Sequence, residues 1–188
     1  PRIDYPMSDN KILDEQTIDR QPIYQGRVVK LDLVSVKLPD GQTSQREIIT
    51  HPGAVAIVAL DEAKNVLMVR QYRLAAGRVM LEIPAGTLEP NEAPIVCAER
   101  ELQEETGYKP QNLTPIGGIF VAPGYTTEYI HLFRASDLIE SRLEMDSDEF
   151  IEVIKIPLSQ ALDMVDKGEI QDAKSIAGLL RVVRLMPD

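Results

Sequence analysis

The segment spanning residues 86–108 holds the densest group of side chains in this sequence that could do chemistry. It begins with Gly86 and continues into a predicted helix that carries Glu101, Glu104 and Glu105. At about 100° per residue, Glu104 and Glu105 fall within roughly 60° of Glu101 on either side. The three carboxylates therefore share one face of the predicted helix.

Carboxylates placed four residues apart on a helix have Cβ atoms about 5–6 Å apart, and at an effective dielectric of about 20 they repel by about 3 kcal/mol. A bound divalent cation would turn that repulsion into coordination energy, and the hard ions Mg²⁺ and Mn²⁺ prefer carboxylate oxygens. Glutamates on one helix face are more often a solvated surface, however. The cluster by itself leaves both interpretations open.

Other groups near this segment favour a site. Arg100 lies next to the cluster on the same predicted helix and can orient a carboxylate through a bidentate bond. The preceding Ala85-Gly86 pair can bring backbone carbonyls close to an ion, because glycine has no side chain. Glu82, in a predicted strand, points either to solvent or into a polar site. A later stretch is also acidic, although solubility is the simpler explanation for it: Glu144, Asp146, Asp148, Glu149 and Glu152.

Composition limits the classes of function. The 188 residues suit one domain, or one domain with a small appendage, and 44% hydrophobic with 27% charged residues is ordinary for a globular protein. The formal net charge of −10 argues against duplex nucleic acid or an anionic membrane surface as a partner. Phosphate substrates remain compatible, since a few arginines and a bound metal can reverse the local field.

The single cysteine, Cys97, cannot form an internal disulfide, and nothing beside it suggests an activated nucleophile. With no charged-then-apolar leader at the start and no apolar run of membrane-spanning length, we expect a protein of the reducing cytoplasm. A zinc site of nitrogen and sulfur ligands is improbable with one cysteine and the distant His51 and His131. Serine nucleophile elbows, Walker loops and dinucleotide-binding glycine motifs are absent.

The order of predicted elements indicates an α+β protein. Residues 1–22 read as a polar arm, and residues 24–50 as a hairpin or small meander, in which the phase change between Leu33 and Val34 suggests a bulge or a strand covered on both faces. A continuous apolar run over 54–60 predicts a central buried strand. Further strands are expected at 66–69, 79–83, 116–121, 129–133 and 150–156, and helices from about Asn91 to Gly107, at 159–167 and at 174–185. Strands and helices do not alternate strictly, which points to a mixed sheet with helices packed on it, α+β or an α/β/α sandwich.

These residues resemble a known family at one specific motif. The Nudix box reads G-x5-E-x7-R-E-U-x-E-E-x-G-U, where U is aliphatic or bulky and apolar. This sequence matches every position, with the last the loosest: Gly86, Glu92, Arg100, Glu101, Leu102, Glu104, Glu105, Gly107 and Tyr108. The chain therefore resembles a Nudix hydrolase, which implies the Nudix fold and cleavage of nucleoside diphosphate derivatives with Mg²⁺ or Mn²⁺.

The resemblance also implies roles for the box. Glu101 and Glu105 are expected to be the principal metal ligands, with Glu104 and the carbonyl oxygen of Ala85 as further ligands to two or three ions. Arg100, with Glu92, would serve the architecture of the loop and the helix. Two or three ions on a pyrophosphate would neutralise charge, polarise phosphorus and lower the pKa of a bound water.

Other segments are similar to one subgroup. Pro123 lies sixteen residues after Gly107, a position typical of the ADP-ribose pyrophosphatases, and residues 51–55, 69–73, 82–86 and 148–153 are also similar to that subgroup. By this resemblance Arg73 and Glu82 contact the substrate or the metal network. The late acidic loop supplies the group that orients the attacking water, with Glu149 as first choice and Asp148 as second. Arg70 and Glu128 are further substrate-site candidates.

Aromatic side chains are the expected contacts of the adenine, by stacking, and Tyr24, Tyr72 and Tyr125 are the candidates. In the subgroup a small N-terminal antiparallel β domain is exchanged across a homodimer, so we expect residues 1–52 to be an arm and dimerisation domain. Residues 53–188 would form the Nudix hydrolase domain. Neither assignment comes from periodicity or composition.

The sequence therefore predicts a cytoplasmic, homodimeric, Mg²⁺-dependent enzyme that cleaves ADP-ribose to AMP and ribose 5-phosphate. One alternative is the same chemistry on another nucleoside diphosphate sugar, such as GDP-mannose. Another is a Nudix-fold sensor that binds ADP-ribose without cleaving it. Sensors of that kind usually carry a winged-helix segment and a basic surface, which this sequence lacks, and its box is intact.

Overall fold

The computed structural model describes residues 13–144 and 150–186, and the chain divides into two compact units. The smaller unit consists of Pro1–His51 together with Ala122–Thr127, and the larger of Pro52–Val121 together with Glu128–Asp188. The larger unit holds two hydrophobic clusters, which lie on opposite sides of its central strand.

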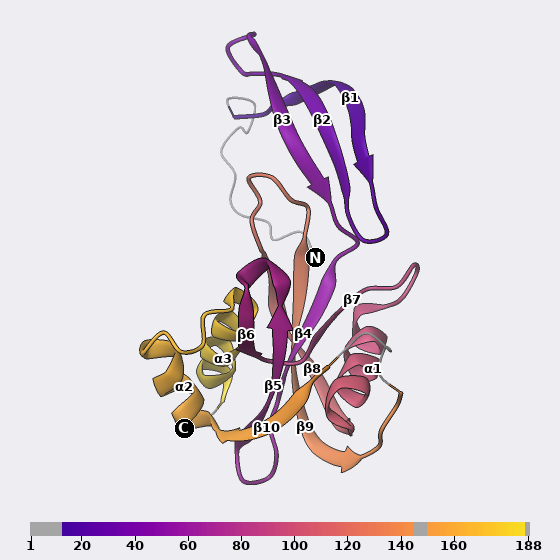
Figure 1. Ribbon diagram of the computed structural model, residues 1–188. Helices are drawn as coiled ribbons and strands as arrows, with labels where there is room; N and C mark the ends of the chain where they lie inside the picture. The colour runs from indigo at the N-terminus through magenta and orange to yellow at the C-terminus, as the bar shows by residue number, and fades with distance from the viewer. Residues whose placement is uncertain (1–12, 145–149, 187–188) are drawn as a thin grey trace. The chain divides into compact units, whose positions relative to one another are not determined.

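The smaller unit is built on an antiparallel sheet of β1 (Gln16–Gln25), β2 (Lys30–Lys37) and β3 (Thr43–Thr50), in that order (Figure 1). The prediction that the polar arm extends to residue 22 was wrong, because β1 already begins at Gln16. All ten residues of β1 are exposed, so no hydrophobic period marks the strand. Pro22 fits within it, since an edge strand can lack one N–H donor.

The phase change in β2 reflects cover on both of its faces. Asp32, Val34 and Val36 are buried, whereas Leu31 and Leu33 on the opposite face are half-buried. The pairing of β2 with β3 is regular, and the register shifts occur instead in the pairing of β2 with β1. Of the two interpretations of the sequence, the strand covered on both faces is the one observed.

The larger unit contains two sheets among the described residues. The first is mixed, in the order β7 (Ala85–Thr87), β4 (Ala54–Ala59), β9 (Tyr129–Glu140) and β8 (Tyr108–Phe120). Its β4 and β9 run parallel, and its other neighbours run antiparallel. The second sheet is antiparallel, in the order β10 (Glu152–Pro157), β5 (Asn65–Arg73) and β6 (Arg78–Glu82).

Helices cover both faces of the mixed sheet (Figure 1). This confirms the predicted α+β fold, in which helices pack on a mixed sheet. Every residue of β4 is buried, as expected of a central strand. Its odd-numbered residues, such as Val55 and Ile57, pack with α1 (Pro94–Thr106). Its even-numbered residues, such as Val58, pack with α3 (Ala173–Leu185), while α2 (Leu158–Asp166) packs beside β10.

The ends of α1 differ in how well they were predicted. The helix ends at Gly107 as expected, because this residue adopts a left-handed conformation with φ of 78°. Its start near Asn91 was wrong, since Asn91 has φ of 66° and lies in the preceding turn. Ala93 is the N-cap residue, and Pro94 occupies the first helical turn, where a missing N–H does least harm.

Strands β8 and β9 are longer than predicted. Strand β8 begins at Tyr108 rather than Ile116, and it contains Pro110 and Pro115. The strand lies at the edge of its sheet, where prolines are tolerated, and its register shifts between Pro115 and Gly117. The first half of this strand was missed because its two prolines are unfavourable in strands.

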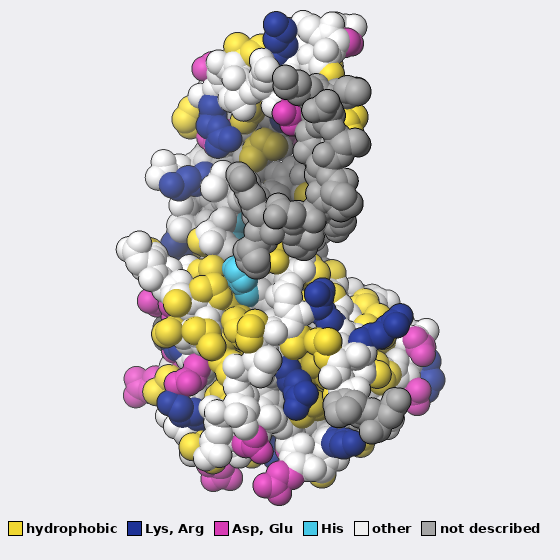
Figure 2. Space-filling view, turned by 180° about the vertical axis from the view of Figure 1, so that it is seen from behind, with side chains coloured by type: hydrophobic (Ala, Val, Ile, Leu, Met, Phe, Trp, Pro, Cys, Tyr) yellow, Lys and Arg dark blue, Asp and Glu magenta, His cyan; other side chains and the backbone are white. Residues whose placement is uncertain are grey.

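The surface of the larger unit mixes side chains of several kinds. Figure 2 shows that, on the face seen there, hydrophobic side chains gather between basic and acidic ones. The net negative charge is therefore not collected in one place on that face. None of the helices described in the structure is both long enough and apolar enough to span a membrane.

Candidate active site

Two glutamates of α1 lie against the backbone of β7. A Cβ atom added to Gly86 would lie 1.8 Å from Cδ of Glu101, so only glycine leaves room for this carboxylate. One residue earlier, the backbone N–H of Ala85 donates to Oε2 of Glu105 at 3.0 Å. Glu101 is 9% exposed and Glu105 is 2% exposed. The structure therefore brings Ala85, Glu101 and Glu105 together.

Arg100 is the common partner of the acidic groups around α1. Its Nη1 donates to Glu101 at 2.8 Å and to Glu104 at 2.9 Å. Its Nε and Nη2 donate to the two carboxylate oxygens of Glu92, at 2.9 Å and 3.0 Å. One guanidinium thus orients three carboxylates, as the bidentate geometry of arginine allows.

These bonds change the acidity of both partners. The hydrogen bonds from Arg100 lower the pKa of Glu92 to about 2, against the smaller opposing effect of burial. The same pairing with Glu92 raises the pKa of Arg100 above its ordinary value. Both groups are therefore charged throughout the neutral range.

Cys97 lies inside the same helix and is fully buried. Its Sγ donates to the carbonyl oxygen of Thr87 at 3.6 Å, and burial raises the pKa of the thiol. A buried thiol with a raised pKa is a poor nucleophile. Cys97 is a packing residue between α1 and β7, in agreement with the sequence-based interpretation.

The donor chemistry around Gly86 fits a divalent cation. Glu101 and Glu105 present carboxylate oxygens from successive turns, and the Glu101 carboxylate occupies the space that a side chain at position 86 would need. Within residues 13–144 and 150–186, however, no three acidic, histidine or cysteine side chains converge closely enough to hold an ion. The two proposed water-orienting groups, Asp148 and Glu149, lie outside the described residues.

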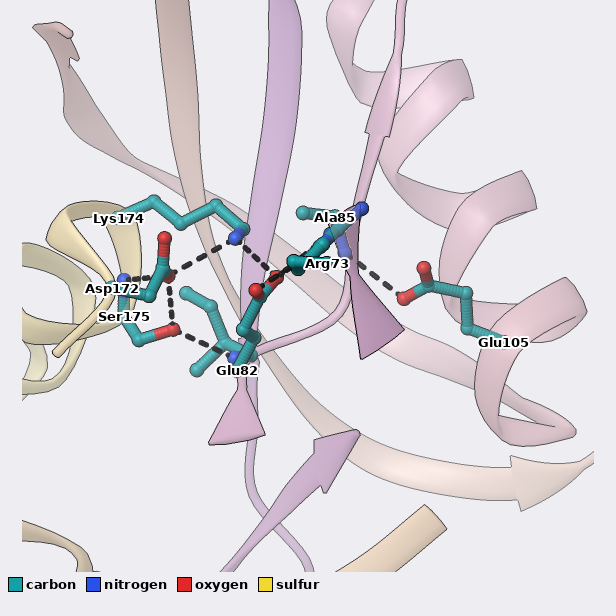
Figure 3. A network of polar contacts seen from close by, with 8 residues as sticks. Arg73, Glu82, Ala85, Glu105, Asp172, Lys174 and Ser175 are labelled. Carbon is teal, nitrogen blue, oxygen red and sulfur yellow. Dashed lines mark hydrogen bonds and ion pairs between the residues drawn. The ribbon is translucent and has the colours of Figure 1, made fainter. Parts of the chain in front are cut away.

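A second polar network joins the ends of β5 and β6 to α3 (Figure 3). Arg73 donates to Glu82 from Nε, at 3.1 Å and 3.2 Å, and from Nη2 at 2.7 Å. Nζ of Lys174 donates to the same carboxylate at 2.6 Å. Burial alone would raise the pKa of Glu82, but the bonds from Arg73 and the charge of Lys174 outweigh it and lower this pKa. Of the two orientations considered for Glu82, the polar site is therefore the one observed.

The α3 side of this network was missed by the sequence analysis. Asp172 caps the helix by accepting from the backbone N–H of Ser175 at 2.9 Å and from its hydroxyl at 2.6 Å. The hydroxyl of Ser175 in turn accepts from the backbone N–H of Ile83 at 2.8 Å. An aspartate three residues before a serine is a recognisable cap pattern, whereas nothing local could have paired Lys174 with Glu82, 92 residues away.

The other substrate candidates come from several parts of the chain. Arg70 pairs with Glu152 at 2.8 Å, and the alternation of β5 places Arg70 and Arg73 on opposite faces of the sheet. Tyr72 is exposed on the same strand. Tyr24 and Tyr125 belong to the smaller unit, where both are exposed. Glu128 belongs to the larger unit and is half-buried.

Comparison with known proteins agrees with the motif. The model of the NUDIX domain matches residues 50–179. The chain is 44% identical over 167 residues to an ADP-ribose pyrophosphatase of Bacillus subtilis (strain 168), covering 88% of this chain and 90% of that protein. It is 43% identical over 168 residues to a methanol dehydrogenase activator of Bacillus methanolicus, covering 88% and 91%.

A solved structure shows the same fold. The crystal structure of an ADP compounds hydrolase superposes with a TM-score of 0.84 at 22% identity, covering 93% of this chain and 95% of the other. The match of the domain model, the intact box and the packing of its Glu101 against Gly86 point to the same conclusion. This chain belongs to the Nudix family.

Proposed function

We propose that this protein is a Nudix hydrolase that cleaves the pyrophosphate of ADP-ribose to AMP and ribose 5-phosphate, with Mg²⁺ or Mn²⁺ as its metal. The observation that carries the proposal is the placement of Glu101 and Glu105 against the side-chain-free backbone at Gly86. The similarity to an ADP-ribose pyrophosphatase over 88% of the chain supports the choice of substrate.

The metal would be held by Glu101 and Glu105, with Glu104 and the Ala85 carbonyl oxygen as further ligands to two or three ions. When bound, it would neutralise charge on the pyrophosphate and lower the pKa of a water molecule. Arg100 keeps Glu101 and Glu104 oriented through bonds of 2.8 Å and 2.9 Å. Fixed carboxylates need little rearrangement when a cation arrives, which favours tight binding.

Arg73 is the main substrate-binding group in this proposal. Two of its nitrogens are fixed on Glu82, while its side chain is 41% exposed and so can meet an anionic ligand. A guanidinium is well suited to the diphosphate, because its planar fork matches two phosphate oxygens. Arg70, Glu128, Tyr24, Tyr72 and Tyr125 stay predictions for the remainder of the substrate.

A positioned carboxylate would orient the attacking water. Glu149, and Asp148 as second choice, keep this proposed role from the family resemblance. The homodimer, in which residues 1–52 would help to complete the partner's site, is likewise part of the proposal. So is the cytoplasmic location.

The direct test is the release of AMP from ADP-ribose by the purified protein with Mg²⁺, in parallel with GDP-mannose and other nucleoside diphosphate sugars. We expect AMP and ribose 5-phosphate in equal amounts, a preference for ADP-ribose, and no turnover in excess EDTA. If GDP-mannose is turned over in preference to ADP-ribose, the proposed substrate is wrong but the proposed type of reaction is right. Binding of ADP-ribose without turnover of any compound in the panel would identify a sensor.

A further inference from the structure

Helix α3 supplies a lysine, Lys174, that shares the carboxylate of Glu82 with the proposed substrate-binding residue Arg73. We propose that Lys174 is a positioning residue for ADP-ribose hydrolysis, which holds Arg73 in its binding orientation through Glu82; this inference rests on the proposed function. Lys174 lies in the first turn of α3 and belongs to neither the Nudix box nor the segments that resemble the subgroup. Its role follows from contacts between distant parts of the chain.

Lys174 is held between two carboxylates. Its Nζ lies 2.6 Å from Oε2 of Glu82 and 3.0 Å from Oδ2 of Asp172 (Figure 3). The Lys174 side chain is 11% exposed and that of Glu82 is 3% exposed. Charged groups this well buried are costly unless they are paired in good geometry. Removing Lys174 would therefore force Glu82 to change its contacts.

Arg73 depends on the orientation of Glu82. Its Nε and Nη2 lie on the Glu82 carboxylate, so the plane of the guanidinium follows the plane of that carboxylate. The bonds to Glu82, and to a smaller degree the charge of Glu105, raise the pKa of Arg73. Arg73 therefore lies close enough to Glu105, a proposed metal ligand, for the two charges to interact. We expect a change in the orientation of Arg73 to affect binding of the diphosphate.

The network is balanced in charge. Arg73 and Lys174 supply two positive charges, and Glu82 and Asp172 supply two negative charges. Without Lys174, Arg73 would be the one cation left among these four residues, bonded to Glu82. We expect Arg73 to be drawn further onto Glu82 and to interact less with an anionic substrate.

The first turn of α3 is also held by an uncharged contact, through Ser175. This contact makes it possible to test docking of the helix separately from the charge of Lys174. Ser175 accepts a hydrogen bond from the backbone N–H of Ile83 at 2.8 Å. Further along α3, a Cβ atom on Gly178 would lie 2.9 Å from Cδ1 of Ile83, which shows how closely the helix approaches. Ser175→Ala weakens helix docking without changing a charge, and Lys174→Met removes the charge but keeps most of the side-chain volume.

The experiment measures KM and kcat for ADP-ribose in the full chain with Mg²⁺. For Lys174→Met we expect KM to rise roughly tenfold with a much smaller change in kcat, the pattern of lost substrate binding. For Lys174→Arg, KM should return most of the way to the wild-type value. Lys167→Met removes the same charge from an exposed position at the end of α2 and should match the wild type.

A double-mutant cycle then tests the route through Arg73. In an Arg73→Lys background, Lys174→Met should change KM little further, because the arginine fork it positions is already lost. Equal effects of Lys174→Met in both backgrounds would overturn the inference. So would a Ser175→Ala variant whose KM rises as much as that of Lys174→Met, since helix docking alone would then explain the result.

Binding of ADP-ribose in EDTA, measured by calorimetry, separates this inference from the proposed function. If the wild type does not turn over ADP-ribose, the proposed function fails. The role of Lys174 is then judged on affinity, and equal affinity of the wild type and Lys174→Met overturns it. If Lys174→Met does not fold, Lys174→Gln, which keeps an N–H donor without the charge, takes its place in each comparison.

Discussion

Two polar regions of the larger unit are both built on buried carboxylates bonded to an arginine, yet their charges are arranged differently. Around α1, one arginine, Arg100, bonds to three carboxylates, of Glu92, Glu101 and Glu104. Around β5, β6 and α3, two cations, Arg73 and Lys174, face Glu82 and Asp172. The α1 region keeps an excess of negative charge, and the second region is balanced.

From this difference we propose that the two regions bind different ligands. An excess of carboxylate next to the side-chain-free backbone at Gly86 suits a divalent cation, which would complete the charge balance. A balanced network with a half-exposed guanidinium suits an anion, because the arginine is fixed but not fully used by its own carboxylate. A nucleoside diphosphate with bound metal carries both signs of charge, so one substrate complex would use both regions.

The largest expected effect comes from the cation region. Glu105→Gln should lower kcat for ADP-ribose by about 10²–10³-fold, comparable with the loss of one group that stabilises transition-state charge. The fold should persist, since glutamine keeps an oxygen that can accept from the N–H of Ala85. Initial rates of AMP release at saturating Mg²⁺ measure this effect.

Glu99→Gln is the matched control, because Glu99 lies on the same helix but pairs with Lys109 at a half-exposed position. It should leave kcat near the wild-type value. Near-normal turnover by Glu105→Gln would remove this residue from the proposed metal site.

A smaller but combined effect is expected at Gly86. Gly86→Ala places a methyl group on the Glu101 carboxylate and should cost about 1–3 kcal/mol in unfolding free energy, as overpacking usually does. It should also reduce kcat, because Glu101 has to leave its position. Urea denaturation and the AMP assay measure the two consequences. A variant with normal stability and normal kcat would show that Glu101 does not need its observed position.

An effect on stability alone is expected at Glu92. The folded-state pKa of about 2 lies below the ordinary 4.5, so its pairing with Arg100 stabilises the fold fully above pH 4.5. That contribution is lost as pH falls toward about 2. Glu92→Gln should therefore lower Tm near neutral pH, by an amount corresponding to about 1–3 kcal/mol.

Thermal unfolding across pH distinguishes this from a general loss of packing. The difference in Tm between the wild type and Glu92→Gln should shrink as the pH is lowered from 4.5 toward 2. A difference that stays constant over this range would show that the ion pair with Arg100 is not the source of the stabilisation.

The sequence predicted the parts of this molecule that local patterns determine. The spacing of the three glutamates predicted that they share one face of α1, and Gly107 predicted the end of that helix. A continuous apolar run predicted β4. These features depend on residues near one another in the chain.

The features that were missed depend on distant contacts or on edge positions. Strand β1 is exposed on both faces and carries Pro22, so neither hydrophobic period nor strand propensity indicated it. Lys174 and Ser175 meet Glu82 and Ile83 only because the fold brings the first turn of α3 to the end of β6. No spacing in the sequence encodes such a pairing, although Asp172 and Ser175 together could have marked the start of α3.

Binding of Mn²⁺ to the substrate-free protein, measured by calorimetry, tests most directly whether the two regions take ligands of opposite charge. We predict that Glu105→Gln weakens Mn²⁺ binding at least about tenfold, as loss of one carboxylate ligand should. Arg73→Lys should bind Mn²⁺ as the wild type does and lose affinity only for ADP-ribose. Equal Mn²⁺ affinity in the wild type and Glu105→Gln would contradict the assignment of the cation to α1.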